Sequence, residues 1–254
     1  MTADAIVYVI APAYLGARRA RRLADGLCAD MPVPTRVVRL TGRGGNLPAA
    51  LDAMTSAGAR HLHVQPVGLP FSDSVAAWLP GALAHWLQTR APANVTATLG
   101  EDQCTNAATL ATVRRQAIDP AHPTEPTTAV PPSLGKPGWD HMPVFEHHLL
   151  VCTGPRCHFR DAPSLRAELI DALRTAGLWQ RCLVSETSCL IPCNRGPIVA
   201  HYPRGRWFRL PDRTAVQRFV DAVLLQGGDA PELVIHDTAT STGDGRAGSG
   251  GCRR

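Results

Sequence analysis

Residues 147 to 202 read HHLLVCTGPRCHFRDAPSLRAELIDALRTAGLWQRCLVSETSCLIPCNRGPIVAHY. The segment holds two cysteine pairs, Cys152-x4-Cys157 and Cys189-x3-Cys193, with 31 residues between them. Each pair follows an apolar run that reads as a strand, and a helical pattern lies between the two pairs. Two strand-to-loop junctions of one small α/β unit can bring their loops to the same edge. We therefore expect four thiolates to gather at a metal site.

The spacing of the cysteines bears on which metal they bind. Structural zinc usually uses C-x2-C pairs, which aim two thiolates at one ion. The wider x4 and x3 loops are better suited to two irons bridged by sulfide, with one cysteine pair per iron. Gly154 and Gly196 would allow the backbone and its N–H donors to approach the sulfurs closely. Structural zinc, two disulfides and a Rieske-type role for His158 stand as alternatives, with His158 interpreted as a polar neighbour.

This motif resembles the thioredoxin-like [2Fe-2S] ferredoxins, which include the Shethna-type ferredoxins and the ferredoxin subunit of respiratory NADH dehydrogenase. The similarity covers about residues 146 to 228, with both cysteine pairs, the long spacer and the hairpin and helix that follow. It implies a thioredoxin-like ferredoxin domain at 147–228, a [2Fe-2S] cluster as cofactor and one-electron transfer as function. The cluster ligands that it implies are Cys152, Cys157, Cys189 and Cys193.

The other four cysteines receive no ligand role. Cys182 lies inside a strand pattern, where we expect a small buried side chain. Cys28 and Cys104 fall on expected helices away from the motif, and Cys252 lies in the tail.

Residues 1–118 alternate strand and helix patterns. Apolar runs at 5–10, 35–40, 61–67 and 95–99 read as buried strands, and a helical pattern follows each of them. Serial βα units predict an open, doubly wound parallel sheet whose ligands bind at the carboxyl ends of the strands. The fold class is therefore α/β, in two domains. A Pro-rich linker is expected at 119–146, between the domains, and a disordered tail at 229–254.

The first domain is similar to the small sirohydrochlorin cobaltochelatases in its size, its short loop after the first strand and the segment HVQPVGLPFSDSVAAWLPGAL at 63–83. The resemblance implies a chelatase-like fold, an association with tetrapyrrole and cobalamin metabolism, and a homodimer through this domain. That family carries a His-Gly-Ser after its first strand and a second His after its third. Here Ala11-Pro12-Ala13 and Phe71-Ser72-Asp73-Ser74 occupy those places.

Both chelatase histidines are thus expected to be absent. Metal insertion needs a base and a metal ligand, two roles that imidazole fills near pH 7. A single carboxylate at Asp73 makes a poor divalent site. His61 and His63 share one strand face, but a two-His site without a third ligand is incomplete.

Composition and charge narrow the remaining function classes. The formal charge of +5 comes without a basic-aromatic stripe, so we expect no nucleic acid partner. No apolar run approaches the ~20 residues of a membrane span, and the N-terminal order of charge and apolar residues does not fit an export signal. We expect a cytoplasmic protein without a membrane partner. The glycine-rich stretch at 41–45 lacks G-x-G-x-x-G, so the electron donor must be a redox partner protein.

Five arginines flank the cluster loops in sequence, either as a solvated rim or as a docking site for an acidic redox partner: Arg156, Arg160, Arg195, Arg204 and Arg206. The favoured function is a [2Fe-2S] electron carrier associated with tetrapyrrole or cobalamin metabolism. The alternatives are a sirohydrochlorin cobaltochelatase-type enzyme with an accessory cluster and a scaffold that carries structural zinc, so whether the chain is an enzyme stays open.

Overall fold

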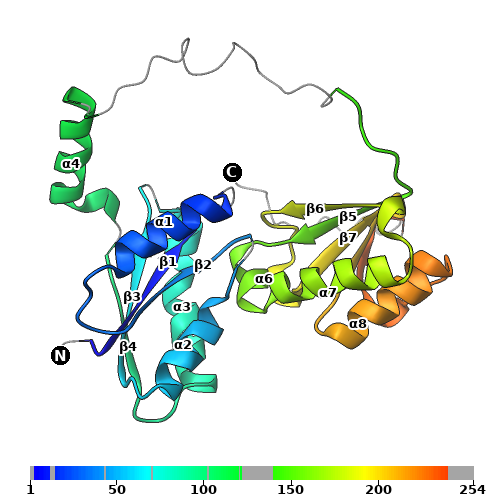
Figure 1. Ribbon diagram of the computed structural model, residues 1–254. Helices are drawn as coiled ribbons and strands as arrows, with labels where there is room; N and C mark the ends of the chain where they lie inside the picture. The colour runs from blue at the N-terminus through cyan, green and yellow to red at the C-terminus, as the bar shows by residue number, and fades with distance from the viewer. Residues whose placement is uncertain are drawn as a thin grey trace, which may run out of the picture. The chain divides into compact units, whose positions relative to one another are not determined.

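The computed structural model describes residues 3–11, 15–42, 44–69, 71–101, 103–119, 121 and 140–239. The chain divides into two compact units, Met1–Pro143 and Val144–Arg254. Each unit is a β-sheet with helices packed against it (Figure 1). In the described part of the chain, no helix combines the length and the apolar character that crossing a membrane would require.

The first unit is built on a four-stranded sheet in the order β2-β1-β3-β4, and all three strand pairs are parallel. This confirms the prediction of a parallel α/β sheet. The strands are β1 (Ala5–Ile10), β2 (Thr35–Arg39), β3 (His61–Val67) and β4 (Thr96–Leu99). The helices are α1 (Ala17–Cys28), α2 (Leu47–Ser56), α3 (Asp73–Thr89), the short 3-10 helix η1 (Gln103–Thr105) and α4 (Ala107–Ile118).

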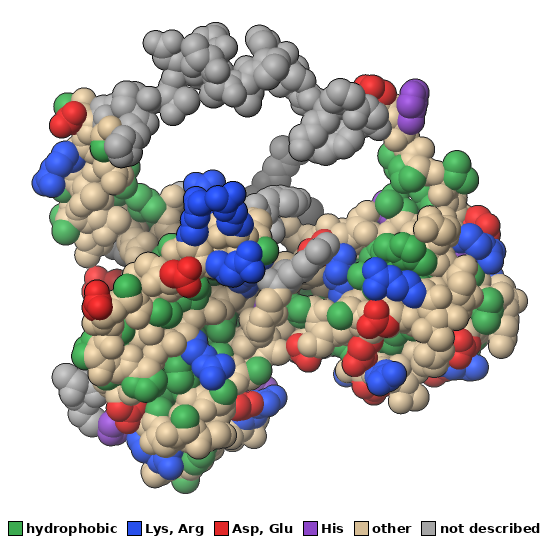
Figure 2. Space-filling model, viewed as in Figure 1, with side chains coloured by type: hydrophobic (Ala, Val, Ile, Leu, Met, Phe, Trp, Pro, Cys, Tyr) green, Lys and Arg blue, Asp and Glu red, His purple; other side chains and the backbone are tan. Residues whose placement is uncertain are grey.

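The helices of the first unit differ in how much apolar surface they bury. Helices α2 and α3 bury apolar side chains, including the fully buried Leu51 and Trp86, whereas α1 and α4 bury none. The side chain of Asn46 caps α2 by accepting from the Ala49 N–H at 2.8 Å. Figure 2 shows basic side chains over α1, whose exposed arginines are Arg18, Arg19, Arg21 and Arg22.

The second unit contains a five-stranded mixed sheet in the order β6-β5-β7-β8-β9. Strands β5 (His147–Cys152) and β6 (Cys182–Thr187) are parallel, and β7 (Ile198–Tyr202), β8 (Arg206–Arg209) and β9 (Val234–Asp237) extend the sheet by antiparallel pairs. The helices are α6 (Pro155–Phe159), α7 (Ala162–Thr175) and α8 (Arg213–Arg218), and α8 continues as the π-helical turns η4 (Phe219–Leu225). Short 3-10 turns are η2 (Trp179–Arg181), η3 (Cys193–Arg195) and η5 (Pro231–Leu233).

One face of this sheet forms the main core of the second unit. Leu149 from β5 and Phe208 from β8 are fully buried against Leu173 of α7 and Phe219 of η4. Because β5 and β6 are parallel, the loops that follow them lie at the same end of the sheet.

The expectation of disorder from residue 229 onward was wrong for the described part of that segment. Strand β9 pairs with β8, and Arg206 forms ion pairs with Asp229 at 2.8 Å and with Asp237 at 2.6 Å. Val234 and Ile235 add apolar contacts to the sheet. The order of β9 therefore comes from its pairing with β8 and from the ion pairs of Arg206. The composition of the segment alone does not reveal these contacts. Residues 122–139 of the expected linker and residues 240–254 of the expected tail lie outside the described residues.

Candidate metal centre

Cys152 and Cys157, here called the buried pair, lie at the end of β5 and in α6. Cys152 is 2% exposed and Cys157 is 1% exposed. They form a small apolar cluster with Ala162 and Ile198, and Trp207 packs against it. Water has little access to these two sulfurs.

Cys189 and Cys193, here called the outer pair, lie in the loop that follows β6 and at the start of η3. Cys189 is exposed, and its Sγ atom lies 3.4 Å from that of Cys193. Two thiolates bound to one tetrahedral metal at about 2.3 Å would be about 3.8 Å apart. The outer pair therefore already has a spacing close to that of two ligands of one iron.

Two glycines allow the loops that carry the two pairs to meet. A Cβ atom at Gly154 would lie 2.0 Å from the carbonyl oxygen of Ser188, and one at Gly196 would lie 2.6 Å from Cys157 Sγ. The loops are joined where the Thr153 N–H donates to the Thr187 carbonyl at 2.8 Å. The close approach predicted at both glycines is confirmed, since any side chain there would collide with the loop of the outer pair or with the sulfur of Cys157.

The buried pair is electrostatically prepared to hold one thiolate. A hydrogen bond from the Cys157 thiol lowers the pKa of Cys152 to about 6, and the N–H groups of Gly154 and Leu190 act in the same direction. The same hydrogen bond, followed by burial, raises the pKa of Cys157. The charge of Cys152 also raises the pKa of Cys193, so the buried pair and the outer pair interact electrostatically. Thiolate is the form of cysteine that binds metals.

The chemistry of this donor set fits an iron–sulfur cluster. Four soft thiol donors suit iron–sulfur chemistry or zinc rather than hard cations such as Mg²⁺. Backbone N–H groups that donate toward the sulfurs are typical of sites that tune a cluster. Within the described ranges, no three His, Cys, Asp or Glu side chains meet as ligands of a single ion would.

The neighbouring candidates take structural positions. His158 is 1% exposed in α6, and its backbone N–H donates to the Gly154 carbonyl at 2.8 Å. Cys182 lies in the main core of the second unit, where burial raises its pKa to about 11, which confirms the prediction of a small buried side chain. Cys28 and Cys104 belong to the first unit, and Cys252 lies outside the described residues.

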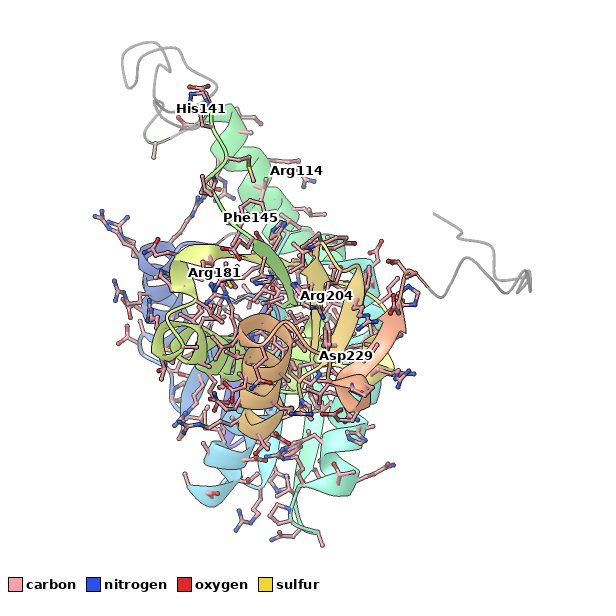
Figure 3. All side chains as sticks on the ribbon, turned by 90° about the vertical axis from the view of Figure 1, so that its right-hand side faces the viewer. Arg114, His141, Phe145, Arg181, Arg204 and Asp229 are labelled. Atoms are coloured by element: carbon pink, nitrogen blue, oxygen red, sulfur yellow. The ribbon has the colours of Figure 1, made fainter. Side chains whose placement is uncertain are left out.

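The five flanking arginines divide into two groups. Arg156, Arg160 and Arg195 lie in α6, directly after it, and in η3, beside the cysteines. Arg204 and Arg206 do not flank the cluster loops, and that expectation was wrong. Because β7 runs away from the cysteines, its turn to β8 lies at the opposite end of the sheet. That end faces the viewer in Figure 3, where Arg181 and Arg204 are labelled.

Sequence reasoning missed Trp207. Its indole N–H donates to the carbonyl of Leu190 at 3.3 Å, inside the loop between the outer cysteines, and its ring packs against the buried pair. The available signal was a large aromatic residue in the second strand of the hairpin, two strands away from Cys152. That signal does not say which loop the ring supports.

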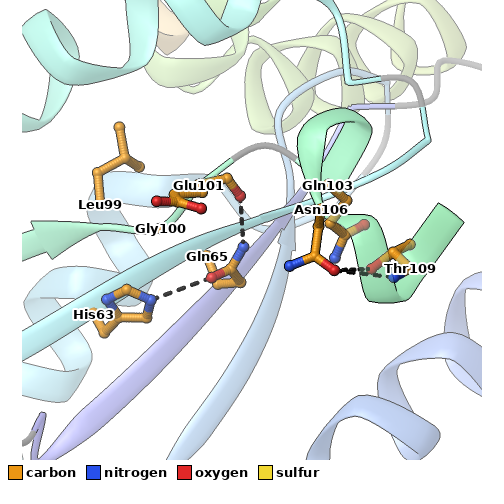
Figure 4. A pocket seen from close by; sticks show the side chains of 8 residues that line it. All are labelled: His63, Gln65, Leu99, Gly100, Glu101, Gln103, Asn106 and Thr109. Carbon is orange, nitrogen blue, oxygen red and sulfur yellow. Dashed lines mark hydrogen bonds between the residues drawn. The ribbon is translucent and has the colours of Figure 1, made fainter. Parts of the chain in front are cut away.

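The first unit has a separate polar pocket of about 540 Å³ at the carboxyl ends of β3 and β4, where parallel sheets bind ligands (Figure 4). His63 and Gln65 line it, and His63 Nδ1 lies 2.8 Å from Thr98 Oγ1. His61 lies on the same strand face, with its Nδ1 2.8 Å from Thr96 Oγ1, so both rings are engaged by threonines. Asp73 begins α3, while Pro12 and Ala13 lie outside the described residues.

Comparisons with known proteins bear on about a third of the chain. No protein-family model matches the sequence. A "Ferredoxin, 2Fe-2S" from Clostridium pasteurianum is 27% identical over 98 residues, which are 35% of this chain and 96% of that protein. A solved thioredoxin-like [2Fe-2S] ferredoxin from Aquifex aeolicus is 25% identical, with a TM-score of 0.35, and the match covers 37% of this chain and 94% of that one. A second structure, of the wild-type form, gives 24%, a TM-score of 0.34, and coverage of 37% and 100%.

Proposed function

We propose that this protein is a one-electron carrier that holds a [2Fe-2S] cluster on Cys152, Cys157, Cys189 and Cys193. The observation that carries the proposal is the close approach, at one end of the mixed sheet, of the two loops that hold the cysteine pairs, which leaves no room for a side chain at Gly154 or Gly196. The Clostridium relative supports it, since that protein is named a 2Fe-2S ferredoxin.

Each part of the site would serve electron transfer in a definite way. When bound, a [2Fe-2S] cluster accepts and releases one electron. The buried pair and Trp207 exclude water from one side of the site. The N–H groups of Gly154 and Leu190 stabilise negative charge on Cys152, and hydrogen bonds to cluster sulfurs influence the reduction potential. The exposed Cys189 would be the ligand nearest to a redox partner.

The test is an anaerobic visible and EPR spectrum of the purified protein, before and after dithionite. We expect a reddish-brown absorption that bleaches on reduction, together with a spin-half EPR signal. Cys189→Ser should remove or strongly alter both signals, and Cys182→Ser, the matched control in β6, should keep them. A colourless wild-type protein with stoichiometric zinc, or a Cys189→Ser protein with an unchanged spectrum, would count against the proposal.

An association of the first unit with tetrapyrrole chemistry is the finer part of the proposal. It is supported by the resemblance of residues 63–83 and by a parallel sheet with a polar pocket at its carboxyl end. Titration of the protein with sirohydrochlorin tests it, and an unchanged tetrapyrrole spectrum at a stoichiometric ratio argues against it. A cytoplasmic location, a redox partner protein and a homodimer through the first unit belong to the same proposal.

A further inference from the structure

The outer pair forms the edge of the site that reaches solvent. Cys189 is exposed and Cys193 is half-buried, whereas Cys152 and Cys157 are covered. The rate of electron transfer falls steeply with distance, so a protein partner has to meet the edge formed by Cys189 and Cys193.

Three arginines, here called the arginine rim, lie in or next to the loops that carry the cysteines: Arg156, Arg160 and Arg195. Arg160 Nη1 donates to the carbonyl oxygens of Cys193 at 3.0 Å and of Arg156 at 3.4 Å. Arg195 Nη1 donates to the carbonyl of Ile235 at 3.4 Å. The charge of Arg156 acts on the Cys193 thiol, opposing the rise in its pKa that burial causes. The side chains of the rim are therefore held beside the cysteines.

The loops around the cysteines carry no opposing charge of their own. Residues 153–160 and 188–197 contain the three rim arginines and no Asp or Glu. A [2Fe-2S] cluster on four thiolates is itself anionic, so it would repel an acidic protein unless cations surrounded it. Guanidinium groups at the surface offset that repulsion, and they can bind carboxylates through two hydrogen bonds each.

Ile191 adds an apolar contact point between the outer cysteines. It is 72% exposed, and its φ of +37° is a conformation that β-branched residues rarely adopt. An exposed apolar side chain in a loop that also carries arginine matches the usual composition of a protein interface, with an apolar centre and a polar rim.

We propose that this edge docks an acidic redox protein, whose contact face carries carboxylates around an apolar recess. The inference rests on the proposed function and names the chemistry of the partner for that same site. Charge complementarity of this kind raises the rate of encounter and selects the orientation in which the exposed cysteine faces the partner.

The first experiment measures binding rather than electron transfer. A fluorescein-labelled deca-glutamate peptide is titrated with the full-length, cluster-loaded protein at low salt and followed by fluorescence anisotropy. The rim variant replaces Arg156, Arg160 and Arg195 by Gln. The control makes the same change in net charge with three exposed arginines at the opposite end of the sheet: Arg174→Gln, Arg181→Gln and Arg204→Gln.

We expect the rim variant to bind the peptide about tenfold more weakly, and the control to bind it as the wild type does. The exposed arginines of α1 are intact in both variants, so a difference between the rim and control proteins comes from the replaced arginines. Added salt should remove the difference, because it screens exposed charges.

The second experiment follows oxidation of the dithionite-reduced protein by stopped flow. One electron passes from the reduced protein to ferricyanide, which becomes ferrocyanide, or to the cation hexaammineruthenium(III), which becomes hexaammineruthenium(II). In the wild type, added salt should slow the reaction with the anion and accelerate that with the cation. In the rim variant, the ferricyanide reaction at low salt should be about tenfold slower, with a weaker salt dependence.

Equal losses in the rim and control variants would overturn the inference alone, because the effect would then come from net charge. A rim variant with a shifted midpoint potential but unchanged peptide binding would overturn it as well, since the arginines would act on the cluster and not on a partner. A wild-type protein without the visible and EPR signals of a cluster would overturn the proposed function and this inference together.

Discussion

His147 and His201 form a pair at the end of the mixed sheet that is far from the cysteines. His147 Nδ1 lies 3.0 Å from His201 Nε2, and His201 has no exposed surface. The rings of Phe208 and Phe219 flank His201, with centroids 6.4 and 6.1 Å away. Burial lowers the pKa of His201 to about 4, and the charges of His147 and Arg204 act in the same direction.

The sign of the pH effect follows from which state binds the proton. The unfolded chain protonates His201 near pH 6.5, whereas the folded protein resists protonation until about pH 4. Between these values the unfolded state holds more protons, so stability falls as the pH falls. The difference between the two pKa values corresponds to about 3 kcal/mol in total, and about 1.4 kcal/mol of it should be lost between pH 7.5 and pH 5.5.

The assay compares the wild type with His201→Gln, in which an amide that does not titrate faces His147. Free energies of unfolding come from urea titrations followed by circular dichroism at the two pH values. The wild type should lose about 1.4 kcal/mol more than the variant on acidification. Because both proteins contain the same first unit and the same cysteines, their contributions cancel.

His236→Gln serves as the control, because His236 is exposed on β9 and its replacement leaves the His147–His201 contact intact. This control should keep the wild-type pH dependence. A His201→Gln protein that loses as much stability as the wild type between pH 7.5 and pH 5.5 would refute the reasoning.

Two further substitutions test the packing of each unit. Gly196→Ala should abolish or bleach the visible spectrum, because its Cβ would lie 2.6 Å from Cys157 Sγ, whereas Gly26→Ala, with nothing within 4 Å, should leave it unchanged. A normal spectrum in Gly196→Ala would contradict the packing described for that loop. Asp52→Ala should destabilise the first unit by about 1–3 kcal/mol in urea titrations, because it leaves the N–H of the fully buried Trp86 without its 2.8 Å acceptor. A loss below about 0.5 kcal/mol would show that the bond contributes little.

Local signals in the sequence were enough to predict much of the secondary structure. The first unit alternates strands and helices where the apolar runs and the helical patterns predict them. Helix α7 lies between the cysteine pairs, and Gly177 follows its end with a φ of +69°. These features depend on residues a few positions apart, which is why they can be inferred from the sequence.

The placement of the four cysteines also follows from local pattern to a large extent. A strand that ends at Cys152 and a parallel strand that ends just before Cys189 must release their loops at the same end of the sheet. The spacing of the cysteines alone did not reveal that the buried pair is covered while Cys189 stays exposed. Burial is decided by side chains such as Trp207 and Ile198, which arrive from other strands.

Only the tertiary structure decided the surroundings of the site. In sequence, Arg195 and Arg204 are nine positions apart and both lie near the cysteines, yet they lie at opposite ends of the second unit. The physical reason is that β7 carries the chain away from the cysteines by about 3.3 Å per residue before it turns. Strand β9, which composition assigns to a disordered tail, is likewise ordered by hydrogen bonds to β8 and by the ion pairs of Arg206. Sequence determined which groups can bind a metal, and the direction of each strand determined which charges surround them.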